Sequence, residues 1–498
     1  MAFELNFIAI NGVCNAQSHR HTKRKTLLKM KRIKDGIKRT RHAKHKTHTK
    51  RAKMRVHFSK IGFILAVAGG AVGLGNAWKF PTLTAQNGGF AFVLLYLAFT
   101  LTIGLSVFFA EIALGRLSRA DLASAYENLA LSHKKQWKNA GVFMLGGVFV
   151  LSFYLMIMGW VLKYMVFSLF ALPQSVQSAG ESFTALVGEE FALSLGFYLA
   201  SFFLTLFVVS KGLIKGIERL NLIIMPTLFV MLVLLLGFCM SFEKGFSSAF
   251  AYLFEPNFAK FTLKSVLEAL GLSLFTLCLG VGCIVTYAAS LNSRTNFVQS
   301  TLFIVLINIV ISLMMSLIVL TFIFEFDADP QTQGAGLVFV SLMSLFANFG
   351  GLGNFLAFYF FLALFFAGIT SAVSMIEPLV FYLTTRHGFS RLKALCFIGV
   401  FVLFLGVLCL LSLNANFAQG LNFGGKSFFE LLDFFASNVI LPLGVFVSAI
   451  FVGFFVDTKR LYKLFSRFMS KKAFKVWLFS LRFICPLLIL AVAVYQLF

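Results

Sequence analysis

The stretch Gly69-Gly70-Ala71-Val72-Gly73-Leu74-Gly75-Asn76 interrupts the first long apolar segment of this chain near its middle. The surrounding segment, residues 61–81, is long enough to cross a bilayer, which takes about 20 apolar residues. Glycine lacks a Cβ atom, so the backbone can leave helical geometry here at little steric cost. Irregular backbone at membrane depth is tolerated only where it is buried in protein or lines a cavity. The stretch therefore predicts a broken membrane span whose free carbonyls and helix ends hold a polar cargo.

Composition sets the class of protein. The 498 residues are 59% hydrophobic and 13% charged, with a mean hydropathy of +0.88. These values are typical of an all-α polytopic membrane protein and exclude a soluble domain. The seven cysteines are scattered without CxxC spacing, so we expect neither a disulfide framework nor a zinc site.

Hydropathy predicts eleven transmembrane helices, at residues 60–83, 89–115, 140–171, 191–210, 219–241, 262–290, 296–325, 336–384, 392–413, 428–456 and 474–498. The window 336–384 is too long for one crossing, and we expect it to include a re-entrant or helical outer loop.

The charges of the loops orient these spans. Lys and Arg gather in four loops, at residues 116–139, 211–219, 386–393 and 457–475. Two other loops, at residues 172–190 and 326–336, contain acidic residues and no Lys or Arg. Because positive loops mark the cytoplasmic side, we expect a cytoplasmic N-terminus and, after eleven spans, a periplasmic C-terminus.

Residues 1–57 form a separate region. Within residues 1–60 there are 18 Lys and Arg against Glu4 and Asp35, and few large apolar side chains. Such a composition predicts a basic, disordered cytoplasmic tail. Two interpretations of this region stay open. In the first, the native protein starts at Met54 and the preceding residues are not part of it. In the second, the tail exists and contacts anionic lipid. We expect no nucleic-acid partner.

A second broken span lies at residues 262–290, where small and hydroxyl residues occupy the stretch 274–282. Small residues in one such cluster alone are explained by close helix packing. Two interrupted spans at matching places in two halves instead indicate an inverted-repeat transporter. We therefore expect a 5+5 core over residues 58–456, with repeats 58–241 and 262–456 and with spans one and six unwound. Residues 457–498 would add a cytoplasmic loop and the eleventh helix.

Several long motifs, in the same order, resemble the neurotransmitter:sodium symporter family, in its eleven-span bacterial branch that carries amino acids. Residues 69–81, GGAVGLGNAWKFP, resemble the family's block AGSAVGLGNxWRFP. Further matches are Asn87-Gly88-Gly89, Glu111 through Arg116, residues 275–280 (FTLCLG), residues 366–371 (FAGITS) and residues 432–434 (LDF). The resemblance covers residues 58–498. It implies a sodium-coupled symporter that imports a neutral, apolar or aromatic amino acid across the bacterial inner membrane by alternating access.

The resemblance also implies two sodium sites. Sodium is a hard cation that prefers oxygen ligands, which broken spans supply without a buried fixed charge. The first site would use Ala71, Asn76, Thr276 and Asn308. The second would use Gly69, Val72, Ala367, Thr370 and Ser371.

The implied cargo pocket comprises Gly70, Ala71, Gly73, Val150, Tyr154, Phe275, Thr276, Cys278, Val281, Ser371 and Met375. Helix N-termini and the Tyr154 hydroxyl would bind the cargo carboxylate. Monoamine carriers of the family have an aspartate at the position of Gly73, so glycine favours an amino acid over an amine. For Cys278 and Met375 alone, ordinary core packing is as good an explanation as cargo contact.

Departures from the family pattern concern the gates and the anion. The outer gate would consist of Lys79, Asp433 and Phe275, with lysine in place of the usual arginine, which loses the bidentate fork. The inner gate positions correspond to Met54 and Thr385, which cannot form an ion pair. Chloride is left open: Tyr96, Thr276, Asn308 and Ser312 match a chloride site, but Leu272 replaces a glutamine that usually contributes.

Other classes of protein fit less well. Outside the tail there are only two histidines, His133 and His387, and few intramembrane carboxylates (Glu111, Glu377 and Glu268), so we expect no enzyme. Those carboxylates are interpreted as structural.

A channel is a rival interpretation, because channels also line their pores with broken helices. The nearest alternative is a proton-coupled amino-acid carrier of the same fold, whose usual marker is absent because Thr370 and Ser371 occupy the second sodium site. The sequence does not fix the amino acid, the sodium stoichiometry or the oligomeric state, for which we expect a monomer or a weak homodimer.

Overall fold

The structure, a computed structural model, describes residues 57–258, 261–292, 294–327 and 337–497. The predicted tail 1–57 and the proposed start at Met54 therefore lie outside the described residues, apart from residue 57. Within the described chain, nine helices are long and apolar enough to cross a membrane, and one bent pair of helices makes ten. The two helices of the predicted span 262–290, separated by residues 277–282, complete the eleven predicted spans.

The first span is broken where the glycine-rich stretch predicts it. It comprises α2 (Lys60–Ala71), a short π-helix η1 (Gly75–Lys79) and α3 (Phe80–Gln86). The two parts meet at an angle of 65°. Val72, just after α2, has extended backbone with φ −79° and ψ 105°. The Ser59 side chain caps the start of α2 by accepting a hydrogen bond from the Gly62 N–H at 2.9 Å, a contact worth about 1 kcal/mol.

The sixth span is broken in the same manner. It comprises α13 (Leu263–Thr276) and α14 (Cys283–Ala289). Between them Gly280 and Gly282 have positive φ of 86° and 81°, which glycine adopts without steric cost. The Gly280 N–H donates a 2.8 Å hydrogen bond to Glu111 Oε1, which satisfies one amide that the break leaves without a helical partner.

The remaining elements are helices and two short strands. Spans two to five and their connections comprise α4 (Phe90–Phe99), η2 (Thr100–Gly104), α5 (Leu105–Ser118), α6 (Leu122–Leu129), α7 (Lys134–Trp137), η3 (Lys138–Phe143), α8 (Met144–Phe167), α9 (Val176–Gly188), α10 (Phe191–Ser210), η4 (Leu213–Glu218), α11 (Arg219–Cys239) and α12 (Glu243–Phe254). Spans seven to nine comprise α15 (Phe297–Glu325), η5 (Leu337–Ser341), α16 (Leu342–Ala347), α17 (Gly351–Arg386) and α18 (Arg391–Leu413). The last two spans and their connections comprise η6 (Ala418–Leu421), β1 (Asn422–Phe423), β2 (Lys426–Ser427), α19 (Phe428–Asp433), η7 (Phe434–Ile440), α20 (Leu441–Ile450), η8 (Phe451–Phe455), α21 (Thr458–Phe465), α22 (Lys471–Phe479), η9 (Ser480–Ile484) and α23 (Cys485–Leu497).

The long window predicted at residues 336–384 divides as expected. It holds the short helical elements η5 and α16, followed by the single long span α17. The division of the core into repeats 58–241 and 262–456 stays a prediction.

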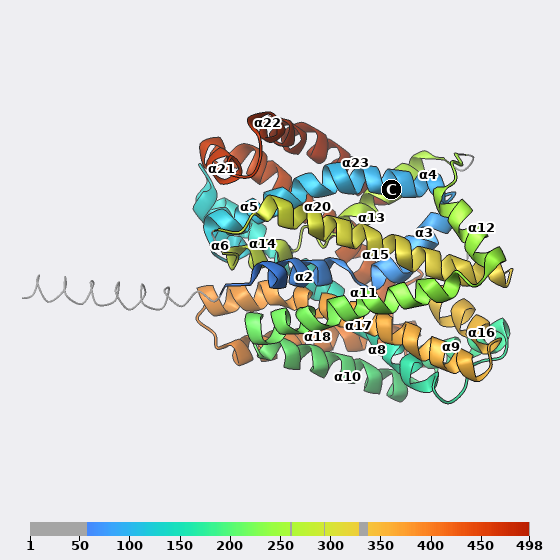
Figure 1. The fold of residues 1–498 in the computed structure, drawn as a ribbon. Helices are drawn as coiled ribbons and strands as arrows, with labels where there is room; N and C mark the ends of the chain where they lie inside the picture. The colour runs from blue at the N-terminus through green and yellow to red at the C-terminus, as the bar shows by residue number, and fades with distance from the viewer. Residues whose placement is uncertain (1–56, 259–260, 293, 328–336, 498) are drawn as a thin grey trace, which may run out of the picture. The chain divides into compact units, whose positions relative to one another are not determined.

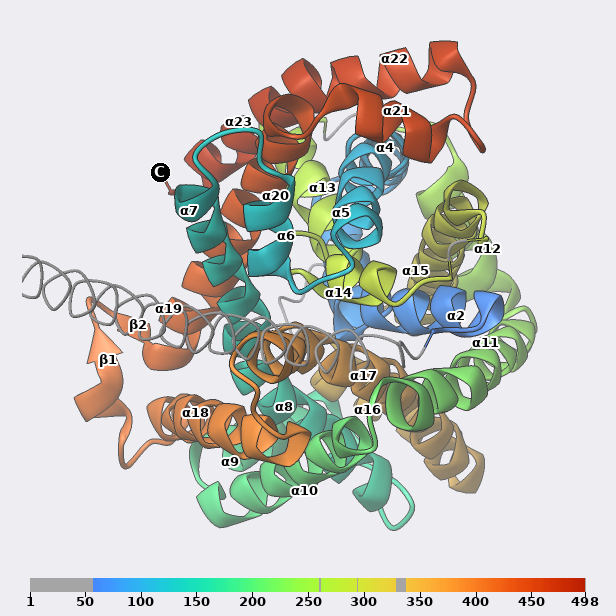
Figure 2. The ribbon, with the colours of Figure 1, turned by 90° about the vertical axis from the view of Figure 1, so that its left-hand side faces the viewer.

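The broken span one lies inside the bundle. Helix α2 packs against α11, α15 and α17, and Figures 1 and 2 show it amid these helices. Most of its residues are buried, including Gly69, Gly70 and Ala71 next to the break. The broken stretch is therefore enclosed by protein, as irregular backbone at membrane depth must be.

Candidate binding site

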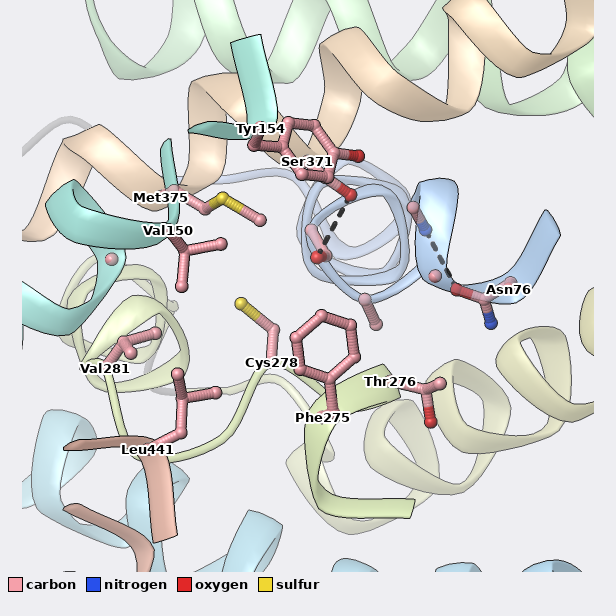
Figure 3. Close-up of a pocket in the computed structure, with 15 residues that line it drawn as sticks. Asn76, Val150, Tyr154, Phe275, Thr276, Cys278, Val281, Ser371, Met375 and Leu441 are labelled. Atoms are coloured by element: carbon pink, nitrogen blue, oxygen red, sulfur yellow. Dashed lines mark hydrogen bonds between the residues drawn. The ribbon is translucent and has the colours of Figure 1, made fainter. Parts of the chain in front are cut away.

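The two broken spans line one cavity with an empty volume of about 450 Å³. Figure 3 shows it between the first span, the sixth span, α8, α17 and the start of α20. All eleven predicted pocket residues line it: Gly70, Ala71, Gly73, Val150, Tyr154, Phe275, Thr276, Cys278, Val281, Ser371 and Met375. Four further lining residues were not predicted as pocket residues: Gly75, Asn76, Gly147 and Leu441.

One side of this cavity is polar and is built by the break of span one. The Leu74 N–H donates to the Tyr154 hydroxyl at 3.1 Å. The Gly73 N–H donates to Asn76 Oδ1 at 3.0 Å (Figure 3). The amides of Gly73 and Leu74 thus point toward side-chain oxygens near the cavity. Amides and a phenolic hydroxyl are groups that can donate to a carboxylate.

The opposite side of the cavity is apolar. Figure 3 shows Val150, Cys278, Val281, Met375 and Leu441 around the open space away from the break of span one. These side chains offer only carbon and sulfur surfaces. The cavity therefore combines a polar end with an apolar end, as a site for an amphiphilic small molecule requires.

The residues predicted for the first cation site lie together beside the cavity. Asn76 Nδ2 donates to Asn308 Oδ1 at 3.0 Å, and Asn308 Nδ2 lies 3.5 Å from Thr276 Oγ1. Ala71 lines the same cavity as Asn76 and Thr276. Within the described residues there is no group of three or more His, Cys, Asp or Glu side chains that could hold a metal ion. The oxygens available here belong to amides, a hydroxyl and the backbone.

The residues predicted for the second cation site are joined through Ser371. Its hydroxyl lies 3.0 Å from the Gly69 carbonyl oxygen and 2.9 Å from that of Val72. Thr370 Oγ1, on the same helix α17, lies 3.0 Å from the Ala367 carbonyl oxygen. The structure thus brings the Ser371 hydroxyl of α17 to the carbonyls at the end of α2, while the Thr370 hydroxyl bonds within α17.

The four residues matched to a chloride site also form one cluster. The Tyr96 hydroxyl lies 3.0 Å from Thr276 Oγ1 and accepts a 3.1 Å hydrogen bond from Asn308 Nδ2. Asn76 Nδ2 donates to Ser312 Oγ at 2.7 Å. All of these side chains are buried. Leu272 is also buried, and it offers no polar atom.

A second, larger cavity adjoins the first. It has an empty volume of about 1510 Å³ and is lined by Lys79, Tyr154, Phe275 and Asp433, among others. Tyr154 and Phe275 line both cavities, so these two rings lie between them. Among the described residues the salt bridges do not include Lys79 with Asp433. Asp433 Oδ1 instead accepts a 2.7 Å hydrogen bond from Ser437 Oγ.

The intramembrane carboxylates lie away from the cavity and contact protein groups, in keeping with their structural interpretation. Glu111 accepts from the Gly280 N–H, Glu268 accepts from Asn87 Nδ2 at 2.7 Å, and Glu377 pairs with Arg391. The sequence did not reveal the pairing of Glu377 with Arg391.

At the predicted inner gate, Met54 lies outside the described residues. Thr385 Oγ1 donates to Asp121 Oδ2 at 3.2 Å.

A model of the family described as the sodium:neurotransmitter symporter family matches residues 55–184 and 190–498. The chain belongs to this family. It is a sodium-dependent, multi-pass membrane transporter, as its relatives are, and those relatives are transporters rather than enzymes. The sodium-dependent transporter YhdH of Bacillus subtilis (strain 168) is 33% identical over 439 residues, which cover 87% of this chain and 96% of the relative.

Two further similarities place the transporter within the family. A sodium-dependent transporter of Haemophilus influenzae (strain ATCC 51907 / DSM 11121 / KW20 / Rd) is 28% identical over 451 residues, covering 88% of this chain and 97% of the relative. The crystal structure of MhsT in complex with L-phenylalanine superposes with a TM-score of 0.80 at 33% identity, covering 89% of this chain and all of that chain. The fold expected from the sequence, an all-α transporter with spans one and six unwound, is thereby confirmed.

Proposed function

We propose that this transporter is a sodium-coupled symporter that imports a neutral amino acid with an apolar or aromatic side chain by alternating access. The observation that carries the proposal is the cavity between the two breaks, which is polar at Gly73, Tyr154 and Asn76 and apolar at Val281 and Met375. MhsT, which has the same fold, was crystallised with L-phenylalanine.

The cargo would lie with its carboxylate at the break of span one. The N–H groups there and the Tyr154 hydroxyl would donate hydrogen bonds to it. Because residue 73 is glycine, this end keeps room for a carboxylate. The cargo side chain would face Val150, Val281 and Met375, where a charged group would lose its hydration without gaining a partner.

Sodium would bind at two sites and drive uptake. The first ion would be held by Ala71, Asn76, Thr276 and Asn308 together with the cargo carboxylate. The second would be held by the residues around Ser371. Moving one charge through 100 mV is worth about 2.3 kcal/mol, so two sodium ions with a zwitterion and no transported chloride supply about 4.6 kcal/mol. At 1.4 kcal/mol per decade this corresponds to roughly a thousandfold accumulation, before any sodium gradient is added.

A chloride ion would bind at Tyr96, Thr276, Asn308 and Ser312. The hydroxyls and the Asn308 amide supply donors that suit an anion. The first sodium site shares Thr276 and Asn308 with this cluster, so the anion would lie close to the ion it neutralises.

Gating would involve the rings between the two cavities. Tyr154 and Phe275 would close over the cargo, and Lys79 would then reach Asp433 through one contact or a bridging water. The larger cavity would be the entry side, because its lining includes Phe183 and Val187 from the acidic loop 172–190. The protein would lie in a bacterial inner membrane, with its N-terminus cytoplasmic and its C-terminus periplasmic, as a monomer or a weak homodimer.

Uptake into proteoliposomes tests the proposal. We expect radiolabelled phenylalanine or leucine to accumulate with an inward sodium gradient, to saturate and to show counterflow. Uptake that persists unchanged when potassium replaces sodium would exclude sodium coupling. A proton gradient that drives uptake without sodium would instead identify a proton-coupled carrier, and conductance without cargo would identify a channel.

A further inference from the structure

Asn221 is a fully buried polar residue on α11, where this helix meets α2 and α17. These three helices lie side by side in Figures 1 and 2. Asn221 lies in none of the motifs that identify the cargo or sodium sites. The position is within a predominantly apolar span, where a buried side-chain amide needs a partner for each of its polar atoms.

The amide of Asn221 has one satisfied end and one free end. Nδ2 donates a 2.9 Å hydrogen bond to the Ile217 carbonyl oxygen, one turn earlier. This bond fixes the orientation of the amide, because a reversed amide would set two oxygens against each other. Among the described residues, Asn221 Oδ1 has no hydrogen-bond partner although it is buried. An unpaired buried acceptor is unfavourable unless a cation or a water molecule meets it.

The free oxygen lies beside two residues of the proposed second sodium site. A Cβ atom placed on Gly69 would lie 1.9 Å from Asn221 Oδ1 and 3.0 Å from Thr370 Cβ. Gly69 and Thr370 are both proposed ligands of that ion, and the Gly69 carbonyl already meets the Ser371 hydroxyl. The Asn221 oxygen therefore occupies the space that any side chain at residue 69 would fill, beside two ligand residues.

We propose that the Asn221 amide oxygen is a further ligand for the second sodium ion, contributed by α11; this inference rests on the proposed function. Sodium prefers oxygen ligands, and an amide oxygen adds one without adding a fixed charge to a site that has none. Because α11 lies outside the two helices that supply the other ligands, the contact ties a third helix to the bound ion.

Sodium binding without cargo tests this assignment. The half-saturating sodium concentration is measured by thermal stabilisation of the purified full chain, and by binding of radioactive sodium, at constant ionic strength with choline. We expect Asn221→Leu, which keeps the branched shape but removes the oxygen, to raise this concentration about tenfold, or about 1.4 kcal/mol. Asn221→Ser, which retains an oxygen, should lie between this variant and the native protein. If Asn221→Leu does not fold, Asn221→Ala takes its place.

Asn414→Leu is the matched control, because Asn414, far along the chain after α18, is also a buried asparagine whose amide nitrogen has no partner among the described residues. It should change the baseline stability without changing the half-saturating sodium concentration. An Asn221→Leu variant with native sodium dependence overturns the assignment and leaves Asn221 a packing residue against Gly69. A native protein that sodium does not stabilise at all would instead refute the proposed function.

Discussion

The Lys79 ammonium lies 4.5 Å from the centroid of the Phe275 ring. Phe275 separates the two cavities, and Asp433, the expected partner of Lys79, accepts a hydrogen bond from Ser437 instead. The cation thus rests on the ring that covers the smaller cavity. A cation over an aromatic face contributes about 0.5–2 kcal/mol, depending on how far it is shielded from water. Lys79 therefore helps to hold the ring in place before any contact with Asp433.

The first prediction concerns this contact. Lys79→Gln keeps most of the side-chain length but removes the charge, so Phe275 loses its cation and Asp433 its opposite charge. We expect cargo to dissociate about 2- to 30-fold faster, which corresponds to about 0.5–2 kcal/mol. Release of radiolabelled amino acid from the purified transporter measures this rate. Lys264→Gln serves as a control, since Lys264 is exposed and pairs with Glu268 at 3.7 Å. Equal release from both variants would contradict the role of Lys79.

The second prediction concerns the space at Gly73. A Cβ atom there would lie 2.7 Å from Ser371 Oγ and 3.0 Å from the Tyr154 hydroxyl, closer than side chains normally approach. Overpacking typically costs about 1–3 kcal/mol, so we expect Gly73→Ala to weaken cargo binding about 5- to 150-fold. Equilibrium binding of labelled amino acid provides the measurement. Gly420→Ala places its new methyl group more than 4 Å from the other described residues and should bind as the native protein does.

The sequence predicted the breaks because glycines, Asn76 and hydroxyl residues stand out within otherwise apolar spans. The pocket residues next to these breaks followed from the motifs that carry the family resemblance. Leu441 was missed because it belongs to an ordinary apolar run. It reaches the cavity because spans six and ten approach closely: a Cβ atom at Gly280 would lie 2.6 Å from the Leu441 carbonyl oxygen. Gly444, one turn later, packs on Gly280. A glycine at this place in span ten was the feature of the sequence that indicated a close approach to span six.

Contacts between distant side chains were less predictable. We predicted an ion pair between Lys79 and Asp433 because the family pattern pairs these positions. A sequence alone does not determine whether such a gate is open or closed in a given structure. The partner of Glu377 was unknown for a different reason. Arg391 lies beyond the turn between α17 and α18, and only the packing of these two helices brings it back to the carboxylate.

The third prediction concerns the stability of this ion pair. Glu377 has a side chain only 3% exposed, and it meets Arg391 through two hydrogen bonds, of 2.5 and 3.0 Å. Removing Arg391, whose side chain is 25% exposed, leaves the buried Glu377 charge without its partner and costs at most about 3–5 kcal/mol. We expect Arg391→Met to lower the melting temperature in detergent strongly, and the double variant with Glu377→Gln to recover part of the loss.

The matched control for that pair lies at the surface. Lys244 and Asp327 are 57% and 79% exposed and 2.7 Å apart. An exposed pair of this kind contributes about 0–1 kcal/mol, because water and salt screen it. Lys244→Met should therefore change the melting temperature little at the same scan rate. If Arg391→Met has no larger effect than Lys244→Met, the buried pair does not stabilise the junction of α17 and α18.

The fourth prediction concerns the proposed chloride ion. Ser312 accepts from Asn76, and Tyr96 accepts from Asn308 beside the proposed first sodium site. In the native protein, replacing chloride by the much larger gluconate should weaken sodium-dependent amino-acid binding. Ser312→Glu would supply the missing negative charge from the chain itself, so its binding should no longer respond to the replacement. Ser312→Ala removes the hydroxyl without adding charge and should remain responsive, at higher chloride concentration. A native protein indifferent to gluconate would show that the four side chains satisfy one another and bind no anion.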